Sequence, residues 1–170
     1  VKENTEKPGE FFYENTKMTL NILEAARISK VKKLVYTSSI GAYSSAEVFH
    51  EDKNRDDVPM DMYPGGAKRM AELQIRAYRE QYGLNYTSII PSNIYGPNDN
   101  FNLDHGHVMP MLIHKLYLAK KNNTDFTVWG SGKPLREFIY SKDIAKIAEW
   151  VLFNYKGTDP LIVSGDEEIS

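Results

Sequence analysis

A tyrosine and a lysine stand close together in residues 62–70, MYPGGAKRM, and such a pair could transfer a proton. A lysine ammonium stabilises a nearby phenolate and so prepares a tyrosine to act as an acid or a base. Tyr63 and Lys68 are five positions apart, a spacing that would turn Lys68 well away from Tyr63 in a continuous helix. We therefore expect Tyr63 to lie outside the helix, at its cap before Pro64. The alternative is a surface tyrosine beside a solvated lysine.

A serine-rich run, TSSIGAY, follows a β-rich segment and offers a second reactive group. Ligands of open parallel sheets collect at the carboxyl ends of the strands. Ser39 is therefore expected to project from a strand end toward a ligand crevice. A strand exit whose serines make only local turn hydrogen bonds would explain the same residues.

Two further segments combine polar side chains with tight turns. PSNIYGPNDNF follows the next expected strand and offers the amides of Asn93 and Asn100 beside a Gly-Pro turn. HGHVMP carries His105 and His107, which lack obvious further ligands for a metal ion. A single histidine that carries a proton at the mouth of a site is the interpretation we favour, and no metal site is expected.

Trp129 and Arg136 flank a flexible turn in VWGSGKPLREF. An arginine there could clamp a diphosphate through two hydrogen bonds, while the tryptophan packs against a base or a sugar. A buried tryptophan and a surface arginine form the alternative. Lys115, on an upstream helix, could add a phosphate contact or could simply be solvated.

Composition narrows the class of protein. The chain has 170 residues, which suits one domain with a real core. A hydrophobic content of 41% with 26% charged residues is typical of soluble globular proteins, and no apolar run approaches the roughly 20 residues that span a bilayer. The net charge of −2 predicts neither a nucleic-acid nor a membrane surface. The absence of cysteine excludes disulfides and thiolate metal sites and fits a cytoplasmic location.

Helical patterns alternate with short β-branched runs, which predicts an α/β fold with a parallel sheet flanked by helices. A polar loop over residues 44–61 is too charged for the core, and Ser141 is expected to cap the last helix. The expected helices cover residues 11–30, 64–81, 107–121 and 141–155, and the expected strands cover residues 32–39, 86–96, 126–130 and 161–164.

Apolar residues at intervals of three and four assign faces to these helices. The pattern in the first helix predicts one buried face. The periodic positions are Phe11, Asn15, Met18, Ile22 and Ala25 in the first helix, Met70, Leu73 and Ala77 in the second, Val108, Leu112 and Leu116 in the third, and Ile144, Ala148, Val151, Leu152 and Tyr155 in the fourth.

The chain carries FFYENT, VYTSSIGAY, GGAKRM, PSNIYGPNDNF, HGHVMP and VWGSGKPLREFIYSKD in this order, which resembles the extended short-chain dehydrogenase/reductase family. The later motifs are most similar to those of members that epimerise and reduce GDP-4-keto-6-deoxy-mannose. The resemblance spans nearly the whole chain. It implies a Rossmann-like doubly wound parallel sheet, NADP or NAD as cofactor, a nucleotide-sugar substrate that is GDP-linked, and a homodimer formed through the FFYENTKM and AKRMAELQ helices.

The resemblance also implies roles for single residues. Ser39 would hydrogen-bond the 4-keto oxygen, and Tyr63 would deliver a proton as hydride arrives from NADPH. Lys68 would hold the nicotinamide ribose and lower the pKa of the tyrosine, and His107 would serve as acid or base in the C3/C5 epimerisation. The cofactor side would comprise Asn15, Thr37, Lys68, Pro91 and Asn93, and the substrate side Asn93, Lys115, Trp129 and Arg136.

The sequence departs from the family pattern in two places. Pro64 stands where the family has its catalytic tyrosine, with Tyr63 one place away. Gly41 stands where these enzymes have a second epimerisation residue, a cysteine. The departures keep two other interpretations open: another NAD-dependent nucleotide-sugar 4-epimerase or dehydratase, and a non-catalytic relative that binds a sugar nucleotide or a protein.

The family's glycine-rich fingerprint, which binds the cofactor pyrophosphate at a helix N-terminus, does not occur in the chain. We therefore expect residues 1–170 to be a partial NAD(P)-binding domain that lacks its glycine-rich half and its C-terminal part. That segment alone is expected to be inactive. The fingerprint would be encoded about 80 residues upstream of Lys33, given the size of the missing βαβ units. The residue that selects NAD or NADP would lie in the same missing half.

Overall fold

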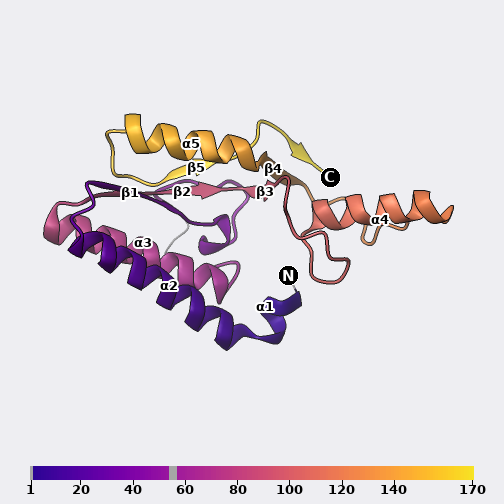
Figure 1. The fold of residues 1–170 in the computed structure, drawn as a ribbon, viewed down its shortest axis with the longest axis horizontal. Coiled ribbons are helices and arrows are strands. Elements are labelled where there is room, and N and C mark those ends of the chain that lie inside the picture. Colours follow the sequence, from indigo (N-terminus) through magenta and orange to yellow (C-terminus); the bar gives the residue numbers. More distant parts are fainter. Residues whose placement is uncertain (1, 54–56) are drawn as a thin grey trace.

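The structure is a computed structural model that describes residues 2–53 and 57–170. The helices are α1 (Lys2–Glu6), α2 (Pro8–Ile28), the short 3-10 turn η1 (Ile40–Ala42), α3 (Pro64–Tyr82), α4 (Val108–Asn122) and α5 (Ser141–Asn154). The strands are β1 (Lys33–Thr37), β2 (Asn85–Pro91), β3 (Asn93–Tyr95), β4 (Arg136–Tyr140), β5 (Leu161–Val163) and β6 (Glu168–Ile169). In Figure 1, α2 and α3 cover one face of the larger sheet, α5 covers the other, and α4 projects away from both.

The larger sheet has the order β1-β2-β5 and is parallel throughout, which confirms the expected Rossmann-like α/β class. Residues 86–90 of β2 are all buried, as is typical of a parallel strand covered on both faces. One side of β2 packs through Tyr86 against Leu23 of α2 and Ile75 of α3. The other packs through Ile89 against Val151 of α5. In the described part of the chain, β1 pairs with a strand on one side only.

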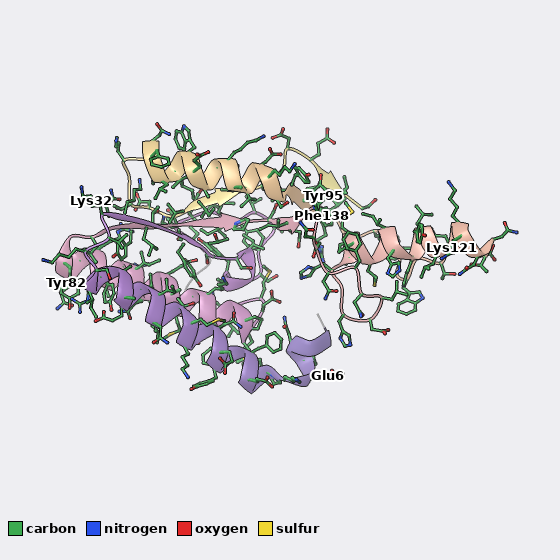
Figure 2. All side chains as sticks on the ribbon, viewed as in Figure 1. Glu6, Lys32, Tyr82, Tyr95, Lys121 and Phe138 are labelled. Atoms are coloured by element: carbon green, nitrogen blue, oxygen red, sulfur yellow. The ribbon has the colours of Figure 1, made fainter. Side chains whose placement is uncertain are left out.

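A smaller sheet of order β3-β4-β6 lies beyond the carboxyl end of β2. β3 and β4 are parallel, and β6 pairs with β4 in the antiparallel direction. The rings of Tyr95 and Phe138 meet edge to face with their centroids 6.4 Å apart where β3 and β4 pair (Figure 2). No helix among the described residues is long and apolar enough to cross a membrane.

The apolar periodicity located the helices but assigned the wrong face to two of them. Met18 and Ile22 of α2 are exposed, whereas Leu23 and Ala26 face the core. The periodic stripe of α3, which includes Leu73, is likewise exposed, and its buried stripe consists mainly of small residues. Both helices carry a second apolar stripe, so periodicity by itself does not identify the side that faces the sheet. In α4, Leu112 is half-buried while Val108 and Leu116 are exposed.

Several expected elements differ in the structure. The single strand expected over residues 86–96 is divided at Ser92, because Pro91 has no N–H and the chain passes there into the smaller sheet. Residues 126–130 are exposed and form no strand, since no partner strand satisfies their backbone in the described chain. The strands β4 and β6 were not expected. The cap of α5 is Tyr140, and Ser141 is already the first helical residue.

The loop over residues 44–61 is polar as expected, but parts of it contact the core. Residues 54–56 of this loop lie outside the described chain. Ser44 is buried, and the ring of Phe49 meets that of Tyr43 edge to face at 6.3 Å. The Glu51 carboxylate accepts a hydrogen bond of 3.2 Å from the backbone N–H of Ile162. The Glu51 carboxylate thus satisfies a backbone donor of β5, an interaction that the polar composition of the loop does not reveal.

The Glu24 carboxylate joins α2 to α3 and gives the fold an acid-sensitive contact. It accepts hydrogen bonds from Arg27 at 2.8 and 2.6 Å and from the Tyr78 hydroxyl of α3. These donors lower the pKa of Glu24 from 4.5 to about 2, with the Arg27 bond as the largest cause. Because the folded state binds the proton less readily, this contribution to stability is present above pH 4.5 and is lost as the pH falls toward 2.

We expect Glu24→Gln to lower the melting temperature of the protein near neutral pH and to reduce the loss of stability between pH 4.5 and 2. Melting curves recorded across that range test this. Glu10→Gln is the control, because the Glu10 side chain is 63% exposed and forms an ion pair of 3.8 Å with Lys7, the residue before α2. Parallel pH curves for the wild type and Glu24→Gln would contradict the assignment.

Candidate functional site

Helix α3 begins directly against the serine turn (residues 37–43, TSSIGAY), and Gly65 permits the contact. A Cβ atom on Gly65 would lie 2.1 Å from the Gly41 carbonyl oxygen, so no side chain fits at position 65 unless this backbone moves. The N–H of Asp61 donates to the same carbonyl at 3.1 Å, and the N–H of Gly65 donates to the Asp61 carbonyl at 2.7 Å. The first turn of α3 and the end of β1 therefore form one unit.

Lys68 extends from α3 to the carboxyl end of β1. Its Nζ donates to the Thr37 carbonyl at 2.9 Å and lies 4.9 Å from the centroid of the Tyr36 ring. Burial lowers the pKa of Lys68 below its usual value, because the partly buried site disfavours the ammonium. An anion or a hydroxyl-rich ligand at this strand end would supply the interactions that the ammonium lacks.

Two other side chains of α3 hold the serine turn, and the sequence reasoning missed both. Arg69 donates from Nε to the Ala42 carbonyl at 2.7 Å and from Nη1 to the Asp57 carbonyl. The hydroxyl of the buried Ser38 donates to the Glu72 carboxylate. In the sequence, Arg69 and Glu72 are marked only by their charge and by their nearness to Lys68. A solvated helix face would explain both features equally well.

Ser39 and Tyr63 lie at this same end of the sheet, but their hydroxyls are not hydrogen-bonded to each other in the described chain. The Ser39 hydroxyl accepts a bond of 3.2 Å from the N–H of Gly41, as in the alternative of a local turn. Tyr63 is the N-cap residue before Pro64, as expected, and is 46% exposed. Its hydroxyl is therefore free to meet a ligand.

The structure gives a steric reason for Gly41. A Cβ atom at position 41 would lie 2.3 Å from Oδ2 of Asp61, so that carboxylate occupies the space into which any side chain would project. Cysteine does not fit at this place unless Asp61 moves.

The other residues expected on the cofactor side are distributed over α2 and the strand ends. Asn15 lies on the half-buried side of α2, where its amide donates to the Phe11 carbonyl at 2.8 Å. Thr37 and Pro91 end the adjacent strands β1 and β2, where Thr37 is exposed and Pro91 is buried. Asn93 begins β3 and donates to the Glu137 carbonyl at 2.9 Å.

The residues expected on the substrate side lie in two places: on the strands β3 and β4, and on α4 with the segment that follows it. Asn93 and Arg136 stand on the neighbouring strands β3 and β4, and Arg136 donates to the Leu135 carbonyl at 2.7 Å. Lys115 of α4 lies over the Trp129 ring, with Nζ 3.9 Å from its centroid. Trp129 is 80% exposed, so the alternative of a buried tryptophan is wrong. A cation stacked on an exposed indole suits contact with a charged, planar ligand.

His107 is the N-cap residue of α4, and its side chain is 62% exposed. Its Nδ1 lies 3.3 Å from Oδ1 of Asp99, a residue of the loop before α4. No group of three potential metal ligands is found in the described residues. Within the same residues, no hydrogen bond or ion pair joins His107, Lys115, Trp129 or Arg136 to the serine turn and Lys68.

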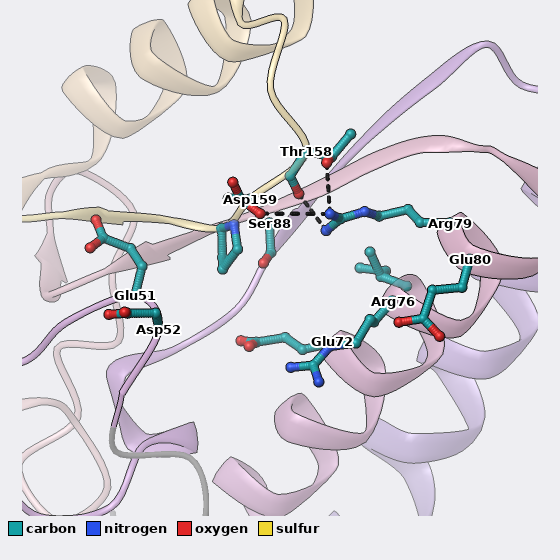
Figure 3. A pocket seen from close by; sticks show the side chains of 11 residues that line it. Glu51, Asp52, Glu72, Arg76, Arg79, Glu80, Ser88, Thr158 and Asp159 are labelled. Atoms are coloured by element: carbon teal, nitrogen blue, oxygen red, sulfur yellow. Dashed lines mark hydrogen bonds and ion pairs between the residues drawn. The ribbon is translucent and has the colours of Figure 1, made fainter.

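A separate polar cavity of about 380 Å³ lies between α3, β2 and the segment before β5 (Figure 3). Arg79 crosses it to the backbone and hydroxyl oxygens of Thr158, both at 2.6 Å. None of the residues expected at the site lines this cavity. Arg79 is held there by Thr158 and lies 3.7 Å from Asp159, so we attribute the cavity to the packing of α3 beside the segment before β5.

The parallel sheet is covered by helices on both faces, which makes the protein Rossmann-like. A helix lysine and the serine turn lie at the carboxyl end of one strand, where sheets of this kind bind ligands. Residues 1–163 match the NAD dependent epimerase/dehydratase family. The chain belongs to this family.

Related proteins agree with this assignment. The chain is 46% identical over 163 residues to GDP-L-fucose synthase of Dictyostelium discoideum, covering 94% of this chain and 51% of that protein. It is 33% identical to the synthase of Escherichia coli, covering 85% of this chain and 47% of that one. A GDP-L-fucose synthetase of Naegleria fowleri, solved bound to NADP, superimposes with a TM-score of 0.86 at 38% identity, covering 92% and 53%. The chain thus spans about half the length of the curated relatives it matches.

The contact between Gly41 and Gly65 can be tested with neighbouring glycines of α3. Gly65→Ala is expected to destabilise the protein by about 1–3 kcal/mol, as for other overpacked sites, because the new methyl group meets a backbone carbonyl. Gly66→Ala is the matched control, since its Cβ would lie 3.5 Å from the Phe12 ring. Gly66 lies in the first turn of α3, so the change is expected to be neutral or to stabilise by at most about 0.5–1 kcal/mol. Equal denaturant midpoints for the two variants would refute the close contact.

Proposed function

We propose that the full-length protein is an NAD(P)-dependent nucleotide-sugar epimerase-reductase that converts GDP-4-keto-6-deoxy-mannose to GDP-fucose with NADPH. The observation that carries the proposal is the unit formed by the serine turn and α3, in which Lys68 reaches the carboxyl end of β1 beside Ser39. Relatives that share this segment at 30% identity or more and are named GDP-L-fucose synthase support it.

The proposed cofactor is NADP, which is bound in the Naegleria relative. When bound, it supplies the hydride for reduction of the 4-keto group. The chain's residues fit the nicotinamide-ribose end, because Lys68 uses one of its three donors on Thr37 and has donors left for ribose hydroxyls. Asn15, Thr37, Pro91 and Asn93 would line the same side. A site for the pyrophosphate would come from protein outside these residues.

The proposed proton donor is Tyr63, with Ser39 orienting the 4-keto oxygen. Pro64, at the usual position of the acid, has no proton to transfer, while Tyr63 at the N-cap is exposed and precedes the turn into α3. In this arrangement Lys68 acts on the tyrosine through its charge, which favours the phenolate.

The proposed base or acid of the epimerisation is His107. The GDP-sugar would contact Asn93, Lys115, Trp129 and Arg136, of which Lys115 and Trp129 already stack. Since Asp61 fills the space beside Gly41, a second epimerisation group at position 41 is not part of the proposal.

Tyr63→Phe in the full-length protein tests the proton donor. Oxidation of NADPH with GDP-4-keto-6-deoxy-mannose is expected to fall by about 100-fold or more, the usual contribution of a general acid. Tyr13→Phe is the control, because Tyr13 is 56% exposed on α2. Unchanged turnover of Tyr63→Phe would remove Tyr63 from the mechanism.

Two other functions remain distinguishable in the same assays. A nucleotide-sugar 4-epimerase or dehydratase would convert a substrate without net consumption of NADPH. A non-catalytic relative, which Pro64 and Gly41 favour, would bind a sugar nucleotide or a protein and show no turnover even in the wild type.

We also propose that the protein is a cytoplasmic homodimer in which α2 and α3 pair with the same helices of a second copy. The support is the second apolar stripe of these helices: Ile22 is 61% and Leu73 is 49% exposed. Large apolar surfaces of this kind are typical of association sites.

The double variant Ile22→Glu/Leu73→Glu is expected to be monomeric in sedimentation experiments, because it places charges within the apolar stripes. Phe153→Glu is the control, since Phe153 is 69% exposed on α5, across the sheet. A dimer that survives the double variant with unchanged affinity would exclude this face.

A further inference from the structure

His107 and Asp99 form a pair that the sequence reasoning did not identify. Nδ1 of the imidazole lies 3.3 Å from Oδ1 of the carboxylate. The Asp99 side chain is only 16% exposed, whereas that of His107 is 62% exposed. The carboxylate is therefore largely withdrawn from water and the imidazole faces outward.

The chemistry of the pair determines which ring nitrogen carries the proton. An ionised carboxylate only accepts hydrogen bonds, so Nδ1 must be the donor and a neutral His107 is the Nδ1–H tautomer. Nε2 then holds the free lone pair. No hydrogen bond of Nε2 occurs among the described residues, which leaves it available to a ligand.

Hydrogen bonds within the loop over residues 99–107 bring Asp99 and His107 together. Asp99 is fixed from its own side, because Oδ1 also accepts the N–H of Asn100 at 2.7 Å. The Asn102 side chain accepts backbone N–H groups of Asp104 and His105 at 2.8 and 3.0 Å. The loop then closes at Gly106, where a Cβ would lie 2.4 Å from the Asn102 carbonyl oxygen. A glycine is required there for the chain to return to Asp99.

We propose that Asp99 is a positioning residue that holds His107 in the Nδ1–H tautomer and presents Nε2 as the base toward the sugar ring. The proposal rests on the proposed function for the role of His107, but the tautomer itself is a property of the free protein. Carboxylate–histidine pairs act in this way elsewhere, by fixing the tautomer and stabilising the imidazolium that forms.

The proposed step is a proton transfer between Nε2 of His107 and one face of the sugar ring. Nε2 takes the proton from a carbon next to the 4-keto group, and the electron pair of the broken C–H bond moves into an enolate. The imidazolium has both nitrogens protonated, and its charge lies beside the Asp99 carboxylate. In D₂O the Nε2 proton of the imidazolium exchanges with solvent, so its return to the carbon restores the ketone and leaves deuterium there.

The first test measures the tautomer in the full-length protein. Nitrogen-15 spectra of the histidines, recorded at a pH where they are neutral, should report a protonated Nδ1 in His107. Asp99→Asn should reduce that signal, because the amide can also donate to Nδ1. His114 is an internal reference, since its Nδ1 contacts the Phe101 carbonyl at 2.7 Å and should keep its tautomer. Asp104→Asn, an exposed change in the same loop, should alter neither histidine.

The second test follows deuterium entry next to the 4-keto group of the substrate. Asp99→Asn is expected to slow exchange by about 10- to 100-fold, as for other groups that orient a histidine, with KM little changed. His107→Gln should give the lowest rate, and adding Asp99→Asn to it should cause no further loss, because both act on one step.

The outcomes separate the two proposals. A wild-type tautomer and a wild-type exchange rate in Asp99→Asn would overturn the positioning role. Wild-type exchange in His107→Gln would instead remove His107 from the proposed function, and the nitrogen-15 spectra would still decide whether Asp99 sets its tautomer. A further loss in the double variant would assign Asp99 a structural role in the loop and would also overturn the proposal.

Discussion

The close approach of Gly65 to the Gly41 carbonyl is the contact on which the Lys68 part of the site depends. With no Cβ on Gly65, the first turn of α3 lies directly on the backbone of the serine turn. That approach brings the side chains of the next helical turn, Lys68 and Arg69, within hydrogen-bond distance of the carbonyls at the end of β1 and in η1. The carboxyl end of the strand and the start of the helix are thus joined by several hydrogen bonds.

The same contact clarifies the unusual spacing of Tyr63 and Lys68. Because the helix begins at Pro64, Tyr63 lies outside it, and the turn before the helix sets the direction of the Tyr63 side chain. The angle per residue of a helix therefore does not decide how Tyr63 and Lys68 are oriented relative to each other. The tight packing also has a consequence for the chemistry. The backbone of Asp61 hydrogen-bonds Gly41 and Gly65, and its side chain fills the space beside position 41. The presence of glycine at this position, where the family has a cysteine, therefore agrees with the packing.

The sequence predicted the alternating helices and strands because their periods and breakers are local properties. It failed where a partner decided the outcome. Met18 and Leu73 belong to real helical stripes, but a helix with two apolar stripes does not reveal which one meets the sheet. Residues 126–130 have the composition of a strand but find no partner strand in the part of the chain that the structure describes. Arg136–Tyr140 is a strand because β3 lies beside it. Strand pairing is a long-range interaction and leaves little trace in the segment itself.

By itself the sequence determined the class of fold and the order of the family motifs, and it proposed candidate site residues such as Ser39, Lys68 and His107. These follow from local patterns and from motifs whose order along the chain resembles that of a family. Only the tertiary structure decided which groups touch. It paired Lys68 with Thr37 and His107 with Asp99. Hydrogen bonds act over about 3 Å, and the fold alone brings residues far apart in the chain to that distance.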